Sequence, residues 1–251
     1  MRADSGGPLE LDIEGATATL TLDRPGRRNV LDADLLTALH RSLDVVHRSP
    51  TVRVLRLGHH GPWFCAGMDL ADVAEPVRTT ADFYSVLERL ALGDLTTIAI
   101  VDGQVAGGGV GLVAACDVVL ASAGSTFSLP EALWGLVPAA VYPFLRRRVG
   151  PGGARHLALS TRTMTAPEAA RMGLVDEVSE RVDQAATAAT RRCVRVDRAT
   201  IARIKAYTNS FDALPAHGGA EAAAVLTAAV RAPGVVDRID KWTRTGRLPW
   251  E

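Results

Sequence analysis

The segment Gln104-Val-Ala-Gly-Gly-Gly-Val-Gly-Leu-Val-Ala-Ala-Cys-Asp117 is the most informative part of this sequence. An apolar, β-branched run at 97–101 precedes its three consecutive glycines, and a small, apolar, proline-free run at 110–116 follows them. This order is typical of a strand, a tight turn and a buried helix. Glycines permit positive φ angles, and the N–H groups at a helix start lack intrahelical partners. The turn can therefore hold a phosphate or a developing oxyanion, or it can simply let the helix pack closely on the strand.

Length and composition fit one large domain, or one domain with a helical extension. The chain has 251 residues, of which 47% are hydrophobic, and this is enough for a sizeable core. Lys+Arg and Asp+Glu are 28 each, and aromatic residues make up only 5%. The balanced charge and the low aromatic content argue against nucleic acid or an anionic membrane surface as a partner.

Cysteine usage and hydropathy favour a cytoplasmic protein. The three cysteines, Cys65, Cys116 and Cys193, are odd in number and lack metal-ligand spacing, so we expect no metal site and a reducing setting. Residues 1–8 lack the apolar core of a signal peptide, and no apolar run is long enough to span a bilayer.

Strand-like and helix-like patterns alternate up to about residue 180. Alternating residues at 9–13 and 16–22 predict a β-hairpin, and Asp32 is expected to cap a helix that runs to about residue 49. Further strands are expected at 52–57, 97–101, 118–121, 126–129 and 174–178, and further helices at 79–92, 141–149, 151–160 and 165–173. After residue 182 the pattern is helical throughout. We therefore expect an α/β core at 1–180 and a helical C-terminal region at 181–251.

Two glycine-bearing loops each follow a predicted strand. The first is Phe64-Cys-Ala-Gly-Met-Asp-Leu70, and the second is Ala106-Gly-Gly-Gly-Val110. If both strands are parallel in one sheet, both loops lie at the edge where α/β folds bind ligands. Backbone N–H groups from the two turns can then converge on one thioester oxygen.

These motifs resemble the crotonase (enoyl-CoA hydratase/isomerase) superfamily over nearly the whole chain. The residues that carry the resemblance are Asp23-Arg-Pro with Asn29-Val-Leu31, the two glycine loops, Ala115-Cys-Asp117, Phe127-Ser-Leu-Pro-Glu131, Gly135-Leu-Val-Pro138 and Gly173-Leu-Val-Asp176. The resemblance implies a crotonase-like ββα spiral core with a helical C-terminal trimerisation region, in a homotrimer or a dimer of trimers. It implies no cofactor other than the phosphopantetheine of an acyl carrier protein or coenzyme A, which carries the acyl group.

The resemblance also implies the site residues. The amides of Met68 and Gly108 form an oxyanion hole. One acid of the family's hydratases lies three residues past the middle glycine, where this chain has Gly111; the other is present as Glu131. A single carboxylate can remove an α-proton and return it to a leaving hydroxyl or to another carbon. The alternative is that Glu131 has no catalytic role and occurs in the first turn of a helix because the helix dipole favours a negative charge there.

Substrate contacts are expected from Ala66, Asp69, Gly107, Arg28 and Tyr84. Arg28, together with Arg24 and Arg27, is expected to meet the phosphate of the pantetheine arm, and the alternative is a solvated basic loop. Tyr84 is expected to line the acyl pocket, and the alternative is simple packing. The arginines at 146–148 are expected at the surface, in contact with a carrier protein or a second subunit.

A narrower resemblance selects the reaction. Residues 64–69, 127–146 and 246–251 are similar to the crotonases of polyketide β-branching, and specifically to their dehydratase. That enzyme removes water from 3-hydroxy-3-methylglutaryl-acyl carrier protein and yields 3-methylglutaconyl-acyl carrier protein. Two alternatives stay open: an enoyl-CoA isomerase or hydratase acting on free acyl-CoA, and a non-catalytic crotonase-like subunit that binds acyl thioesters.

Overall fold

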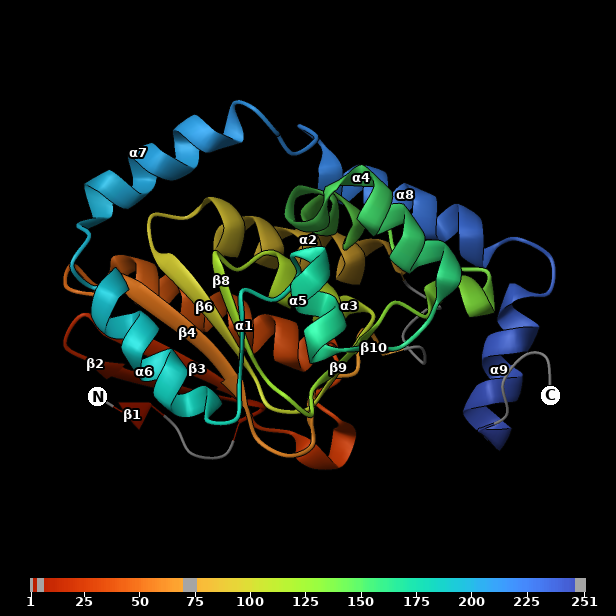
Figure 1. Ribbon diagram of the computed structural model, residues 1–251. Coiled ribbons are helices and arrows are strands. Elements are labelled where there is room, and N and C mark those ends of the chain that lie inside the picture. The colour runs from red at the N-terminus through yellow and green to blue at the C-terminus, as the bar shows by residue number, and fades with distance from the viewer. Residues whose placement is uncertain (1, 4–6, 70–75, 247–251) are drawn as a thin grey trace.

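Two β-sheets surrounded by helices make up the part of the chain that the computed structural model describes, residues 2–3, 7–69 and 76–246 (Figure 1). The larger sheet has the order β1-β2-β3-β4-β6-β8-β11, and the smaller one has the order β10-β9-β7-β5. The strands of the larger sheet are β1 (Arg2–Ala3), β2 (Leu9–Glu14), β3 (Thr17–Leu22), β4 (Val54–His59), β6 (Thr96–Val101), β8 (Val118–Ser122) and β11 (Glu177–Ser179). Those of the smaller sheet are β5 (Trp63–Cys65), β7 (Gln104–Ala106), β9 (Thr126–Ser128) and β10 (Met164–Thr165).

The expected hairpin and the expected helix cap are confirmed. Strands β2 and β3 pair antiparallel, and from β3 onward the larger sheet is parallel. Helix α1 (Ala33–Arg48) begins after Asp32, whose carboxylate accepts a hydrogen bond from the Leu35 N–H at 3.0 Å. This is the capping geometry that aspartate provides at a helix start. The apolar residues of its inner face are buried, namely Leu35, Leu36, Leu39, Leu43 and Val46.

The expectation of one parallel sheet is wrong, because the two glycine loops follow strands of the smaller sheet. After β6 the chain turns at Asp102–Gly103 and starts β7 beside β5, with which it pairs in parallel. A β-carbon on Gly103 would lie 2.4 Å from the Pro62 carbonyl oxygen, so only glycine permits this close approach. The loops nevertheless end at a common edge, because β5 and β7 are parallel neighbours.

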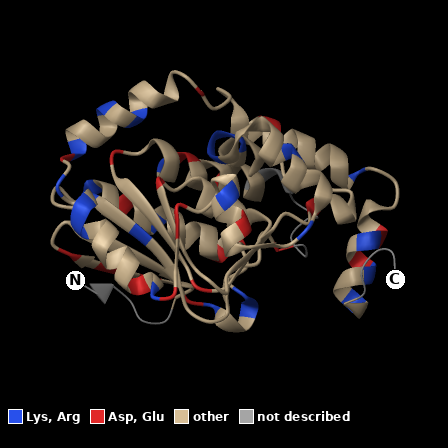
Figure 2. Cartoon of the chain, in the orientation of Figure 1, with Lys and Arg blue, Asp and Glu red and all other residues tan. Residues whose placement is uncertain are grey.

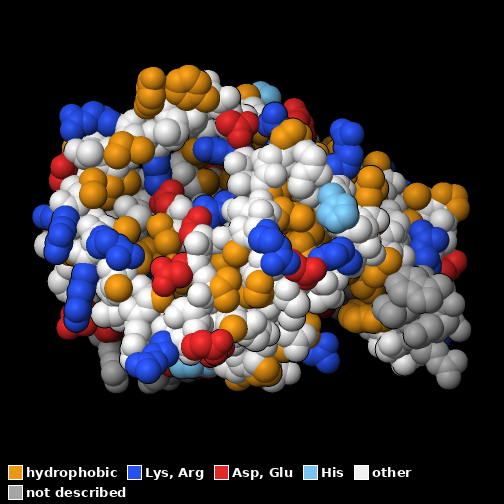
Figure 3. Space-filling model, viewed as in Figure 1, with side chains coloured by type: hydrophobic (Ala, Val, Ile, Leu, Met, Phe, Trp, Pro, Cys, Tyr) orange, Lys and Arg blue, Asp and Glu red, His pale blue; other side chains and the backbone are white. Residues whose placement is uncertain are grey.

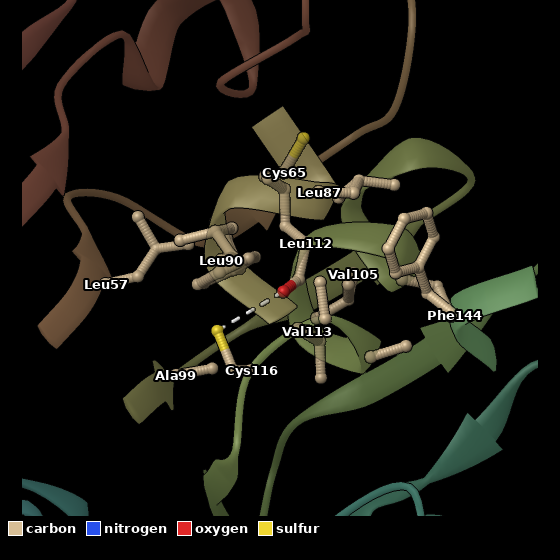
Figure 4. Close-up of a cluster of buried hydrophobic side chains, with 14 of the residues drawn as sticks. Leu57, Cys65, Leu87, Leu90, Ala99, Val105, Leu112, Val113, Cys116 and Phe144 are labelled. Carbon is tan, nitrogen blue, oxygen red and sulfur yellow. Dashed lines mark hydrogen bonds between the residues drawn. The ribbon is translucent and has the colours of Figure 1, made fainter. Parts of the chain in front are cut away.

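The glycine segment leads into a short buried helix, α3 (Gly108–Ala114). Around it lies the main hydrophobic core, part of which Figure 4 shows. Cys116, next to α3, is buried and its thiol donates a hydrogen bond to the Leu112 carbonyl oxygen at 3.3 Å. Cys65 is also buried, and burial raises the pKa of each of these two thiols to about 12. Both cysteines are therefore core residues.

The remaining helices surround these sheets. They are α2 (Pro76–Leu92), α4 (Tyr142–Ser160), α5 (Ala166–Met172) and the short helices η1 (Pro25–Arg27) and η3 (Glu131–Trp134). Helix α4 covers the two helices expected at 141–160 and is broken at Gly150, which has a φ of 74°. Helix α5 begins with a capping box between Thr165 and Glu168, and Gly173 caps its end.

The C-terminal region is helical, as expected, and packs on the α/β core. Its helices are α6 (Val182–Cys193), α7 (Arg198–Asn209), α8 (Gly218–Val230) and α9 (Val235–Thr245). Helix α6 covers β6 and β8, α8 lies along α2, and α9 packs against η3 (Figure 1). The division of the chain at residue 180 stays a prediction.

Helix α7 is anchored mainly by polar contacts. Arg198 forms an ion pair with Asp94 and donates to the Ser49 carbonyl oxygen at 2.6 Å. Lys205 is buried and pairs with Asp117 at 2.8 Å. Asp117 also accepts hydrogen bonds from the backbone and hydroxyl of Thr97. The Ala-Cys-Asp end of the glycine segment thus has a structural role in this chain.

Charged residues of both signs are interspersed over the helices and loops, as Figure 2 shows. This distribution agrees with the zero net charge and produces no single-sign surface. No single helix in the described ranges is long and apolar enough to cross a membrane. Helices α8 and α9, which are bent by 82° relative to each other, together have the length and composition of a membrane span. Buried core helices also have these properties.

Candidate active site

The glycine turn brings a free N–H group to the start of α3. Gly107 has φ 52° and ψ −122°, and its own N–H donates to the Ser128 carbonyl oxygen at 3.0 Å. The next N–H, that of Gly108, is the first of the helix and has no intrahelical acceptor. Within the described residues it donates to no other protein group.

The loop after β5 presents a second free N–H group beside the first. Leu31 bridges this loop: its N–H donates to Gly67 O at 2.8 Å, and its carbonyl accepts from Asp69 N at 3.0 Å. The Met68 N–H lies between these bonds and has no acceptor in the described part of the chain. A β-carbon on Gly67 would lie 3.0 Å from the Gly108 nitrogen, so the two loops are in contact. The expected convergence of the two loops is therefore present.

Both loops line a cavity of about 500 Å³. The expected contact residues Ala66, Met68, Asp69, Gly107 and Gly108 lie on its wall, together with Arg28 and Glu131. The rest of the wall is predominantly apolar and comes from η3, from residues 136–141 and from the C-terminal helices. A concave apolar site with a few converging polar groups is the usual form of a small-molecule site.

Glu131 opens η3 directly after Pro130, and its carboxyl group is buried. The residue as a whole is half-buried, but its Oε2 atom is inaccessible and has no hydrogen-bond partner. Burial raises the pKa of the Glu131 carboxyl to about 7, because a charge is costly in an apolar environment. A carboxylate with such a pKa is suited to accept a proton near neutral pH. A first-turn residue favoured only by the helix dipole would not need this burial.

The chain is clearly related to known proteins. A model of the family described as enoyl-CoA hydratase/isomerase matches residues 12–228. The chain belongs to this family.

Two relatives and one solved structure illustrate the relationship. The chain is 28% identical to the bacillaene synthase dehydratase PksH of Bacillus subtilis, over 97% of this chain and 96% of that protein. It is 31% identical to the short-chain-enoyl-CoA hydratase of Clostridium acetobutylicum, over 68% of each chain. The crystal structure of the Bacillus subtilis protein pksH, described as a candidate polyketide biosynthesis enoyl-CoA hydratase, is 28% identical and aligns with a TM-score of 0.85 over 96% of this chain and 98% of the other. These relatives are named as hydro-lyases, and the chain is an enzyme of the enoyl-CoA hydratase/isomerase family with the crotonase-like fold.

The place of the family's second acid is filled by apolar atoms. A β-carbon on Gly111 would lie 3.1–3.3 Å from side-chain atoms of Val141, Leu87 and Phe83. A carboxylate there would displace core packing and lose its hydration. Among the described residues that line the cavity, the carboxylates are Asp69 and Glu131. Asp69 is held by an ion pair with Arg27 at 2.8 Å, so Glu131 is the acid that is available for proton transfer.

The arginines of the basic loop at 24–28 have two different roles. Arg24 and Arg27 both pair with Asp32, at 2.7 and 2.6 Å. Burial raises the pKa of the Asp32 carboxyl, but the hydrogen bond from Arg24 and the nearby positive charges outweigh burial and hold it below its usual value. Arg28 lies over the Trp63 ring, 5.6 Å from its centroid, and lines the cavity. The loop is therefore an ordered cavity wall, and Arg28 is the arginine placed to meet a ligand.

Tyr84 does not lie on the cavity wall, contrary to the expectation. Its ring is 1% exposed, packs edge-on against Phe144 at 5.1 Å, and faces Gly218 at the start of α8. The cavity residue on α2 is the preceding one, Phe83, whose ring approaches Gly108. Consecutive helical residues point about 100° apart, so only one of the two can face the cavity.

The contribution of the C-terminal helices to the cavity was not predicted from the sequence. Leu226 of α8 and Trp242 of α9 line the cavity, and Trp242 packs edge-on against Trp134 of η3 at 5.6 Å. No local pattern in the sequence predicts these contacts, because Trp134 and Trp242 are far apart in the chain.

Other candidate residues have structural roles. His59 accepts the Asp102 N–H at 3.0 Å through Nε2, and burial lowers the pKa of its imidazole. The expected arginine cluster at 146–148 is engaged within the chain, because Arg146 pairs with Asp212 and Arg148 with Asp176. In the described residues no group of three or more His, Cys, Asp or Glu side chains is placed to hold a metal ion. The motif at 246–251 lies outside the described residues except for Gly246.

Proposed function

We propose that this enzyme is a dehydratase of polyketide β-branching, which removes water from 3-hydroxy-3-methylglutaryl-acyl carrier protein and yields 3-methylglutaconyl-acyl carrier protein. The observation that carries the proposal is the single available carboxylate, Glu131, beside two free amides in an apolar cavity. A lone acid suits a reaction in which one group removes a proton and gives it back. The similarity to the bacillaene synthase dehydratase over nearly the whole chain supports the polyketide assignment.

The mechanism that we propose uses the oxyanion hole and one proton shuttle. The thioester oxygen accepts hydrogen bonds from the Met68 and Gly108 amides, and these stabilise the enolate that forms as the C2 proton leaves. Glu131 takes the C2 proton. The protonated carboxyl then gives that proton to the C3 hydroxyl, the C3–O bond breaks, and water departs while the C2–C3 double bond forms. Glu131 returns to its carboxylate form, so the step is balanced without any further cofactor.

The delivery of the substrate is also part of the proposal. Arg28 is the cavity cation that stacks on Trp63 and pairs with no carboxylate in the described chain, so it suits the phosphate of the pantetheine arm. We propose an acyl carrier protein as the partner, a cytoplasmic location and a homotrimer or dimer of trimers. Exposed apolar side chains on α7 and directly after it support an interface with a second subunit, and the apolar surface over α7 is visible at the top of Figure 3; the residues are Ile204, Tyr207 and Phe211.

Mass spectrometry of the carrier protein tests the reaction directly. The purified enzyme is incubated with 3-hydroxy-3-methylglutaryl-acyl carrier protein, and the loss of one water from the acyl group is followed over time. Glu131→Gln is the matched inactive control. An intact acyl group after long incubation with wild-type enzyme would reject the proposal.

The second candidate is a hydratase or isomerase of free acyl-CoA, favoured by the similarity to the short-chain-enoyl-CoA hydratase. The two candidates differ in the carrier. The same acyl group is therefore offered on coenzyme A and on an acyl carrier protein, and the kcat/KM values are compared. A strong preference for coenzyme A would favour the second candidate, and binding without turnover on either carrier would favour a non-catalytic subunit.

A further inference from the structure

Two polar side-chain atoms on the cavity-lining helix η3 are buried and have no hydrogen-bond partner. One is Oε2 of Glu131, which the proposed reaction uses. The other is Nε1 of Trp134, a residue that is 7% exposed and lines the same cavity. Buried indole N–H groups are nearly always paired in folded proteins, and leaving one unpaired is unfavourable. The structure thus keeps a buried donor without an acceptor one turn away from the catalytic carboxylate.

The geometry of η3 places both side chains on one face. In a 3₁₀-helix residues i and i+3 are eclipsed, and about 6 Å of rise separates them. Glu131 and Trp134 have this spacing. The helix is held at its far end, because Arg238 donates to the Trp134 carbonyl oxygen at 3.1 Å and Gly135 adopts a left-handed conformation. The edge-on contact with Trp242 fixes the indole ring.

The chemistry of the donor restricts what it can bind. An indole N–H donates one hydrogen bond and carries no charge, so it can stabilise an oxygen acceptor but cannot neutralise a free carboxylate. The cations on the described cavity wall, Arg27 and Arg28, lie on the opposite loop and are the groups that suit an anionic part of the substrate. The family's second acid is missing at Gly111, so the leaving oxygen lacks the partner that this acid would supply.

We propose that the indole N–H of Trp134 donates a hydrogen bond to the C3 oxygen of a 3-hydroxyacyl thioester and stabilises it as it leaves. This inference rests on the proposed function, since it assigns a role within dehydration. Trp134 transfers no proton. Glu131 carries the proton from C2 to the C3 oxygen, and the indole hydrogen bond offsets the negative charge that grows on this oxygen while the C3–O bond breaks.

The test separates the two halves of the reaction. Trp134→Phe keeps an aromatic ring against Trp242 and removes the N–H. Dehydration of 3-hydroxy-3-methylglutaryl-acyl carrier protein is measured as water loss. Exchange of the C2 hydrogen with deuterium is measured on the 3-methylglutaryl thioester, which lacks the C3 oxygen and so reports only on the oxyanion hole and Glu131. We expect W134F to lower kcat for dehydration by about 10- to 100-fold, the loss of one hydrogen bond to a developing charge, and to leave the deuterium exchange unchanged.

A second variant controls for packing. Trp242→Phe removes an indole N–H from the same wall but leaves the buried, unpartnered N–H of Trp134 in place, and we expect it to change dehydration and exchange by one common factor. If W134F also slows both reactions equally, Trp134 acts only through packing and the proposal is wrong. If W134F raises KM only for substrates with a distal carboxylate, its N–H binds that carboxylate and the proposal is again wrong.

The failure of this inference is distinguishable from that of the proposed function. Wild-type enzyme and W134F that remove water at the same rate would overturn the role of Trp134 and leave the dehydratase proposal standing. Wild-type enzyme that exchanges the C2 hydrogen but removes no water would overturn both.

Discussion

Gly107 and Glu131 meet at the cavity: a β-carbon on Gly107 would lie 3.2 Å from Oε1 of Glu131. The same glycine turns the chain with φ 52° and places the Gly108 amide at the start of α3. One residue without a side chain therefore allows the proposed base and the proposed oxyanion hole to be neighbours. This contact links the glycine segment to the acid that lies more than twenty residues later in the chain.

Gly107→Ala tests this contact. The added methyl group strains a left-handed backbone position, which costs about 1–2 kcal/mol of unfolding free energy, and it displaces the Glu131 carboxyl. We expect a lower kcat/KM together with the lower stability, measured by water loss and by urea unfolding. Gly124→Ala is the matched control, because no other heavy atom comes within 4 Å of a β-carbon there. A fully active G107A enzyme would contradict the arrangement.

The rate of dehydration should depend on pH through Glu131. The carboxylate form is the base, and burial raises the pKa of this group to about 7. We therefore expect kcat/KM to rise with pH and to reach half of its plateau near pH 7. Glu131→Gln should lower kcat by about 10²- to 10⁴-fold, the usual contribution of a general base. A wild-type profile that is flat between pH 5 and 9 would exclude Glu131 as the base.

The same pKa predicts that Glu131 destabilises the fold at alkaline pH. The folded state binds the proton more tightly than the unfolded chain, in which the glutamate has a pKa of 4.5. The free energy of unfolding therefore falls as the pH rises from 4.5 through about 7. The full effect is about 3 kcal/mol, because each pKa unit corresponds to about 1.4 kcal/mol. Glu131→Gln should therefore raise the Tm relative to wild type more at pH 9 than at pH 5. Calorimetry at both pH values checks this, and an equal difference at both would contradict it.

The sequence was sufficient for features that depend on local chemistry. The capping by Asp32, the glycine turn and the position of Glu131 after Pro130 follow from residue types a few positions apart. The smaller sheet was not predictable, because β5 and β7 have three residues each and carry no periodicity. The choice between Phe83 and Tyr84 depends on the rotation of α2, which is set by tertiary packing. The contacts of Trp242 with the cavity depend on how distant helices dock.

Gly111→Glu should not restore a second acid. The space around this position is occupied by Val141, Leu87 and Phe83, so the new side chain must push apart a packed core and bury a charge. We expect a loss of about 2–4 kcal/mol of unfolding free energy, a sum of overpacking and desolvation, and no gain in hydration of an enoyl thioester. Urea unfolding and a hydration assay measure the two effects. A stable variant with faster hydration would show that the cavity still accommodates the two-acid mechanism.

If the protein forms the proposed oligomer, we expect α7 to lie at the interface between subunits. Tyr207, in the last turn of α7, and Phe211, just beyond its end, are 68% and 74% exposed, and their rings pack edge-on against each other at 5.1 Å. Exposed aromatic pairs of this kind mark interaction surfaces, because their burial removes apolar area from water. The double variant Tyr207→Ser with Phe211→Ser should shift the mass measured by light scattering from that of a trimer or hexamer toward that of a monomer. Leu159→Ser is the control, since Leu159 is 73% exposed but belongs to the last turn of α4 rather than to α7. An unchanged mass for the double variant, with the wild type oligomeric, would place the interface elsewhere on the molecule.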